Sequence, residues 1–121
     1  MTIKTILCVD DSPMELRMLA STLTEAGYTV ATAQNGKEAI AVAARFKPDL
    51  ILMDVNMPEM DGFQATRVLS GSAETKMIPV VLVTSKDQKA DRVWAQMLGV
   101  KGYITKPYPP QTILDTVKAI A

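Results

Sequence analysis

The chain has 121 residues, of which 48% are hydrophobic and 21% are charged, and its 13 Lys and Arg balance its 13 Asp and Glu. This length suggests a single domain over residues 1–121, large enough for a core without disulfide or metal support. The zero net charge argues against a nucleic-acid-binding surface, the absence of histidine excludes histidine-based catalysis, and the single cysteine excludes a disulfide framework. Because no apolar run is long enough for a membrane span or a secretory signal, we expect a cytoplasmic protein with no membrane partner.

The chain opens with a short apolar strand, predicted over Thr5–Val9. Ser12 and Glu15 then have the spacing of a capping box, which predicts the start of a helix. Gly27 is expected to end that helix in a left-handed conformation. The residues predicted to face inward, at helical spacing, are Leu16, Leu19, Leu23 and Ala26.

A second strand and a second helix follow. The strand is predicted over Tyr28–Ala33, and Asn35-Gly36 has the composition of a turn. The helix is predicted over Glu38–Phe46 and is expected to stop before Pro48. Its inward residues are expected to be Ala39, Ile40 and Ala43.

The third strand, Leu50–Met53, is an uninterrupted apolar run, which is typical of a strand buried on both faces of a parallel sheet. After a loop at residues 57–60, Asp61 is expected to cap a third helix over Phe63–Leu69. The small polar residues of Ser70–Thr75 predict a surface loop.

The last part of the chain repeats the same alternation. A fourth strand over Val80–Val83 ends at Thr84, and Ser85–Gln88 resembles another capping box. The inward face of the fourth helix is predicted to consist of Ala90, Val93 or Trp94, and Met97. A fifth strand is predicted over Gly102–Thr105. A last helix is expected after Pro109-Pro110, with inward residues Ile113, Leu114, Val117 and Ile120.

Strand and helix therefore alternate along the whole chain. This alternation predicts an α/β fold, a doubly wound parallel sheet of five strands with five helices on its two faces, joined by right-handed crossovers. Ligands bind such a sheet beyond the carboxyl ends of its strands, so the residues after each strand are the candidate site.

Polar side chains follow four of the five predicted strands: Asp10 and Asp11, then Asp54, Thr84 and Lys106. Because parallel strands end at the same edge, we expect these side chains to meet. Two carboxylates ~4 Å apart repel by about 4 kcal/mol at an effective dielectric of about 20, so three of them need a neutralising partner. Hard oxygen ligands favour Mg²⁺, with Mn²⁺ as an alternative. An ammonium and a hydroxyl beside that metal predict a phosphoryl site, in which a carboxylate can be the nucleophile.

Each candidate also has a purely structural explanation. The alternatives are helix capping for Asp10 or Asp11, a turn for Asp54, strand packing for Thr84 and Tyr103, and solvation for Lys106. Trp94 and the eight methionines are expected to be packing residues rather than cofactor contacts.

Taken together, these residues resemble the receiver domain of two-component response regulators over the whole chain. The matching positions are Asp10-Asp11, Asp54, Met57-Pro58, Asp61-Gly62, Thr84 and Lys106-Pro107. The resemblance implies a flavodoxin-like fold with strand order 2-1-3-4-5 and a receiver domain without an output domain. Phe63–Arg67, Thr84–Lys86 and Trp94 also resemble stand-alone receivers of chemosensory systems, especially those that control type IV pili and twitching motility.

The resemblance implies how phosphorylation occurs. A sensor histidine kinase presents phosphohistidine, and Asp54 is the phosphoacceptor that attacks it. Asp11, Asp54 and the backbone carbonyl of Asn56 hold Mg²⁺, and Asp10 assists through water. Lys106 pairs with the phosphoryl oxygens.

The resemblance also implies a switch. Thr84 moves toward the phosphoryl group and Tyr103 swings inward behind it. The surface formed by the fourth helix, fifth strand and fifth helix then changes and binds a downstream protein. We expect a monomer.

Three other functions are possible for these residues. A Mg²⁺-dependent phosphatase would form an aspartyl-phosphate and turn over, but Asn56 stands where such enzymes usually have an acid/base carboxylate. A receiver that is never phosphorylated would not need the complete set of site residues. A flavin-binding module of similar topology would place three acids against the flavin phosphate. We therefore expect a phosphoacceptor rather than an enzyme with a separate substrate.

Overall fold

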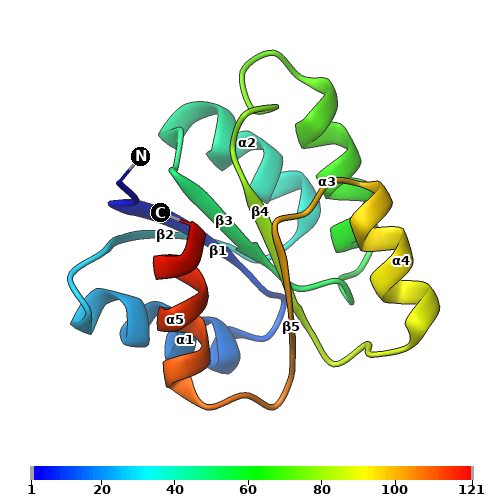
Figure 1. Ribbon diagram of the computed structural model, residues 1–121. Helices are drawn as coiled ribbons and strands as arrows, with labels where there is room; N and C mark the ends of the chain where they lie inside the picture. The colour runs from blue at the N-terminus through cyan, green and yellow to red at the C-terminus, as the bar shows by residue number, and fades with distance from the viewer. Residues whose placement is uncertain (1, 121) are drawn as a thin grey trace.

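The computed structural model describes residues 2–120. Its strands are β1 (Thr5–Val9), β2 (Thr29–Ala33), β3 (Leu50–Met53), β4 (Val80–Thr84) and β5 (Gly102–Thr105). Its helices are α1 (Pro13–Glu25), α2 (Gly36–Phe46), α3 (Gly62–Gly71), α4 (Lys89–Met97) and α5 (Pro110–Ile120). All neighbouring strands are parallel, in the order β2-β1-β3-β4-β5 (Figure 1). The predicted fold class and strand order are therefore confirmed.

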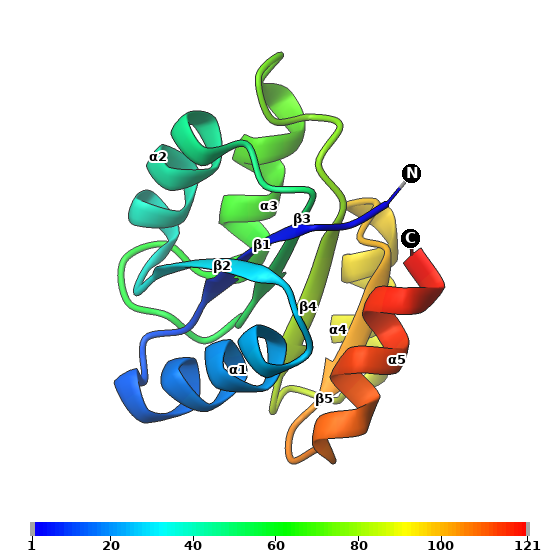
Figure 2. The same cartoon turned by 90° about the vertical axis from the view of Figure 1, so that its left-hand side faces the viewer.

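The sheet separates two apolar cores. Figures 1 and 2 show α1 and α5 on one face and α2, α3 and α4 on the other. Successive side chains of a strand point to opposite faces, so Ile6 and Leu50 pack with α1 and α5, whereas Leu7 and Ile51 pack with the other three helices. Because both faces are covered, all of β3 and β4 is buried.

The ends of α1 follow the sequence signals in part. The Ser12 hydroxyl accepts a hydrogen bond from the Glu15 N–H, and Gly27 has the positive φ of 101° expected after a helix. The Ser12 N–H, however, donates to Asp10 Oδ1 at 2.9 Å. The Ser12 N–H therefore donates to the carboxylate that follows β1, instead of to the Glu15 carboxylate as in a capping box. Ala26, predicted to face inward, is exposed.

The start of α2 differs from the prediction. Asn35 caps the helix through a bond from the Glu38 N–H, so the residues taken for a turn begin the helix at Gly36. A Cβ at Gly36 would lie 2.8 Å from the backbone oxygen of Met60. Because Gly36 has no side chain, the first residue of α2 can pack closely against the β3–α3 loop.

The third helix begins as predicted and ends later. Asp61 and Gln64 form a capping box at its start, which confirms Asp61 as the N-cap. The helix runs to Gly71, and Thr75, predicted to lie in a surface loop, is buried, with its hydroxyl donating to the Leu69 carbonyl at 2.7 Å. This side-chain bond satisfies a carbonyl at the end of the helix.

The predicted inward face of α4 is wrong. Ala95 is the buried residue of this helix, whereas Val93, Trp94 and Met97 are 46%, 38% and 72% exposed. The helix begins at Lys89, and the Ser85 capping box is not formed. The small side chain of Ala95 contributes to the core, so the larger apolar residues of the helix face away from it.

Several of the methionines predicted to be packing residues are exposed: Met14, Met18, Met77 and Met97. Over residues 2–120, no helix is both long enough and apolar enough to cross a bilayer.

Candidate functional site

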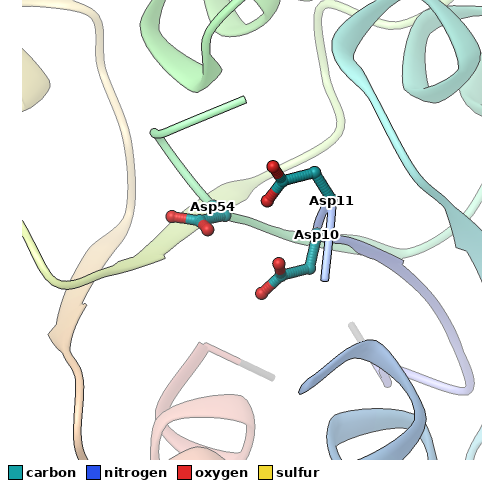
Figure 3. Close-up of side chains that lie close together, drawn as sticks. All are labelled: Asp10, Asp11 and Asp54. Carbon is teal, nitrogen blue, oxygen red and sulfur yellow. The ribbon is translucent and has the colours of Figure 1, made fainter. Parts of the chain in front are cut away.

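Three carboxylates gather at the carboxyl edge of the sheet. Asp10 and Asp11 follow β1, Asp54 follows β3, and one oxygen from each lies within 4.8 Å of the others (Figure 3). Asp10 and Asp54 are only 4% and 7% exposed, whereas Asp11 is exposed. The sequence prediction that these acids converge therefore agrees with the geometry.

Backbone bonds at the ends of the strands hold the two buried acids. The Asp10 N–H donates to the Ala33 carbonyl, and the Asp54 N–H donates to the Val9 carbonyl, so both acids continue the ladder of the sheet. Oδ1 of Asp54 accepts from the N–H groups of Val55 and Asn56, at 2.7 and 3.3 Å. These bonds fix the orientation of the Asp54 carboxylate and leave Oδ2 for other partners.

Oδ2 of Asp54 lies 3.3 Å from the ammonium nitrogen of Lys106. The same nitrogen lies 2.8 Å from Oδ2 of Asp10 and 3.3 Å from Oε1 of Glu15. The peptide bond that follows this lysine, Lys106-Pro107, is cis. One ammonium thus contacts three carboxylates. The sequence predicts only a capping role for Glu15, and nothing in its spacing indicates this contact with Lys106.

The ionisable groups of the site perturb one another. Burial raises the pKa of the Asp54 carboxyl, with Asp10 adding to this effect and Lys106 opposing it. Burial alone would lower the pKa of the Lys106 ammonium, but bonds and charges from Asp10, Asp54 and Glu15 outweigh it and raise that pKa. Lys106 therefore stays charged, and one positive charge faces several negative ones.

The chemistry of these donors fits a hard divalent cation. Three converging carboxylates with a single ammonium leave an excess of negative charge, and all three offer the oxygen ligands that Mg²⁺ prefers. Asn56, the other predicted metal residue, lines the same cleft as Asp11 and Asp54.

The cleft makes the site accessible. Its volume is about 670 Å³, and Asp11, Asp54 and Lys106 line it together with Ser85. It continues between α1 and α5, which lie side by side in both ribbon views, and there its lining is more apolar: Met18, Tyr108, Pro110 and Ile113. Asp54 and Lys106 therefore line a cleft that is open to solvent.

The two predicted switch residues, Thr84 and Tyr103, both contact Lys86 of the β4–α4 loop. Thr84 is fully buried, and its hydroxyl oxygen accepts from the Lys86 N–H at 3.2 Å. The Tyr103 hydroxyl donates to the Lys86 carbonyl at 2.6 Å. Burial raises the pKa of the Tyr103 phenol. Lys86 thus links Thr84 to Tyr103, while Tyr103 itself lines a separate groove between α4 and β5.

Comparisons with known proteins agree with this geometry. Residues 6–118 match the family described as "Response regulator receiver domain". Protein PilH of Pseudomonas aeruginosa is 48% identical over 115 residues, covering 95% of each chain. The structure of the chemotaxis response regulator CheY4 of Vibrio cholerae superposes with a TM-score of 0.91 at 34% identity, over 99% of this chain and 100% of that one.

A further similar structure bears on the metal. The receiver domain of sensor histidine kinase PA1611 from P. aeruginosa superposes with a TM-score of 0.88 at 27% identity, over 98% of this chain and 97% of that one. That structure is described as having a magnesium ion coordinated in its active site cleft.

Proposed function

Because the chain belongs to the response regulator receiver domain family, we propose that it is a signalling protein switched by phosphorylation of Asp54. The observation that carries this proposal is the convergence of Asp10, Asp11, Asp54 and Lys106 on one open cleft. The proposed phosphoryl donor is a sensor histidine kinase.

In the proposed reaction, Oδ2 of Asp54 is the nucleophile, since Oδ1 already accepts two backbone hydrogen bonds. A bond forms between this oxygen and phosphorus as the bond from phosphorus to the donor histidine breaks. We propose that Lys106 pairs with the phosphoryl oxygens, and its contact with the Asp54 carboxylate supports this role. The electron pair of the broken bond stays on the imidazole nitrogen of the donor histidine.

We propose that Asp11, Asp54 and the backbone carbonyl of Asn56 hold Mg²⁺, or Mn²⁺ in its place, and that Asp10 assists through water. When bound, the metal supplies charge stabilisation for the phosphoryl oxygens. In its absence, the excess of carboxylates would repel an incoming phosphoryl group.

The proposed output is a change of surface. Thr84 and Tyr103 are the proposed switch residues, and the downstream protein would bind the face formed by α4, β5 and α5. The exposed apolar side chain of Val93, which lines the groove between α4 and β5, supports this choice of face. The identity to PilH and the fold shared with a chemotaxis regulator favour a role in chemosensory or type IV pilus signalling.

Proteins of this family act in signalling, and we propose that this chain turns over no separate substrate. Asn56 supports this choice because an amide cannot serve as the acid/base group that an aspartyl-phosphate phosphatase requires. Repeated hydrolysis of a phosphomonoester by the purified protein would contradict it.

The test of phosphorylation is labelling with acetyl phosphate and Mg²⁺, read by intact-protein mass. The wild type should gain one phosphoryl group, and Asp54→Asn should gain none. Asp61→Asn is the matched control, because asparagine caps a helix about as well as aspartate and this residue lies outside the cluster. Labelling of Asp54→Asn, or none of the wild type, would overturn the proposal.

A further inference from the structure

The β4–α4 loop is fastened by a side chain for which the sequence offered no role. We propose that Arg92 is a positioning residue: it holds Tyr103 and the loop in their resting arrangement and so sets how readily the site responds to phosphorylation. This inference rests on the function proposed above, in which Thr84 and Tyr103 move.

Arg92 connects three parts of the chain. It extends from α4, and its Nε donates to Oδ1 of Asp87 in the β4–α4 loop at 2.7 Å. Its Nη2 donates to Oγ1 of Thr105 on β5 at 2.9 Å. The guanidinium carbon also lies 4.8 Å from the centre of the Tyr103 ring, within cation–π range.

These contacts join the bonds that lead to Thr84. The Tyr103 hydroxyl donates a hydrogen bond to the Lys86 carbonyl, and the Lys86 N–H donates one to the Thr84 hydroxyl oxygen. The loop is therefore held at Lys86 from two sides and at Asp87 by Arg92. If Thr84 moves toward a phosphoryl group and Tyr103 leaves its place, the Lys86 bonds must change and the Arg92–Tyr103 contact must break.

Arg92 therefore stabilises the arrangement seen without a phosphoryl group. Its side chain is 49% exposed and that of Asp87 is 47% exposed, so each contact is individually weak. The same exposure means that truncating Arg92 leaves the cores untouched. Because a ligand's apparent affinity scales with the fraction of protein in the competent state, loss of Arg92 should raise that affinity.

The test is calorimetric titration with beryllofluoride, a phosphoryl mimic, in the presence of Mg²⁺. Arg92→Ala should bind about three- to tenfold more tightly than the wild type, the change expected if weak contacts of one state are lost. Arg67→Ala is the matched control. Arg67 also lies over an aromatic ring, 5.7 Å from the centre of Trp94, but it belongs to α3 and not to the loop. The affinity of Arg67→Ala for beryllofluoride should equal that of the wild type.

A second readout separates positioning from a merely structural role. In Mg²⁺ alone, the Thr84 amide resonance of Arg92→Ala should move along the line that joins the wild-type positions without and with beryllofluoride. Equal beryllofluoride affinities of Arg92→Ala and wild type, or a resonance displaced off that line, would overturn the role of Arg92. Failure of the wild type to bind beryllofluoride, or equal binding by Asp54→Asn, would instead overturn the proposed function.

Discussion

Within a single residue, Asp54, the two carboxylate oxygens have different surroundings. Backbone N–H groups hold Oδ1, while Oδ2 faces Lys106 and the open cleft. The side chain is nevertheless buried, and burial opposes its ionisation. The site thus keeps a carboxylate in a place where charge is costly, which is common where a group must react.

The unfavourable burial of the Asp54 carboxylate predicts how the stability of the protein depends on pH. Because the pKa of Asp54 is raised in the folded protein, the wild type loses stability as pH rises from the ordinary carboxyl pKa through the raised one. Asp54→Asn lacks this titration, and Asp10 still pairs with Lys106. Thermal melts without divalent metal should therefore show a higher Tm for Asp54→Asn at neutral pH, by an amount that shrinks as pH falls below the carboxyl range. A constant difference across pH would contradict this cause.

Among the elements, the beginning of α3 is packed directly against the site. The Gly62 N–H donates to the Val55 carbonyl at 2.9 Å, and a Cβ at Gly62 would overlap the backbone oxygen of Asp54. A helix can approach the backbone of Asp54 this closely only through glycine. The position of α3 and the orientation of Asp54 are therefore coupled.

Gly62→Ala should lower the free energy of unfolding by about 2 kcal/mol or more, as overpacking against backbone does, and should slow acetyl phosphate labelling. Gly71→Ala, at the other end of the same helix, is the control, since a Cβ there would meet no other part of the protein within 4 Å beyond its neighbours and the backbone of its own helix. It should leave labelling unchanged. Urea melts and labelling time courses of the two variants would check this, and equal effects of both substitutions would argue against the coupling.

For the whole molecule, the sheet gathers charges from distant parts of the chain. Asp10 and Lys106 are 96 positions apart, yet their side chains are 2.8 Å apart. The repulsion of Asp54 by Asp10 and Asp11 is a property of the folded state, since an unfolded chain keeps Asp54 away from the other two acids. A cation that binds the cluster should therefore stabilise the fold.

Adding Mg²⁺ at about 100 times its dissociation constant should stabilise the wild type by about 2.7 kcal/mol, by mass action alone. The increase in Tm should be absent or much smaller in Asp11→Asn, whose carboxylate belongs to the cluster, and unchanged in Asp49→Asn, whose carboxylate instead bonds the N–H groups of Lys4 and Thr5. Differential scanning calorimetry with and without Mg²⁺ would measure this. The same increase in all three proteins would mean that the metal binds elsewhere.

The alternation of strands and helices, and the acids that end β1 and β3, could be predicted from the sequence because they depend on local pattern and on the shared edge of parallel strands. The orientation of α4 could not. This helix contains more apolar residues than it buries. Ala95 packs into the core, and Val93 and Trp94 are exposed. The spacing of apolar residues within a helix does not show which face of that helix will pack against the sheet.

The sequence by itself determined the fold class and the identity of the acids and the lysine at the edge of the sheet, because these follow from periodicity and strand direction. Only the tertiary structure decided that Glu15 joins Lys106 and that Arg92 lies over Tyr103. The contacts of long, flexible side chains depend on which groups the packed elements bring within reach, and local sequence does not predict these contacts.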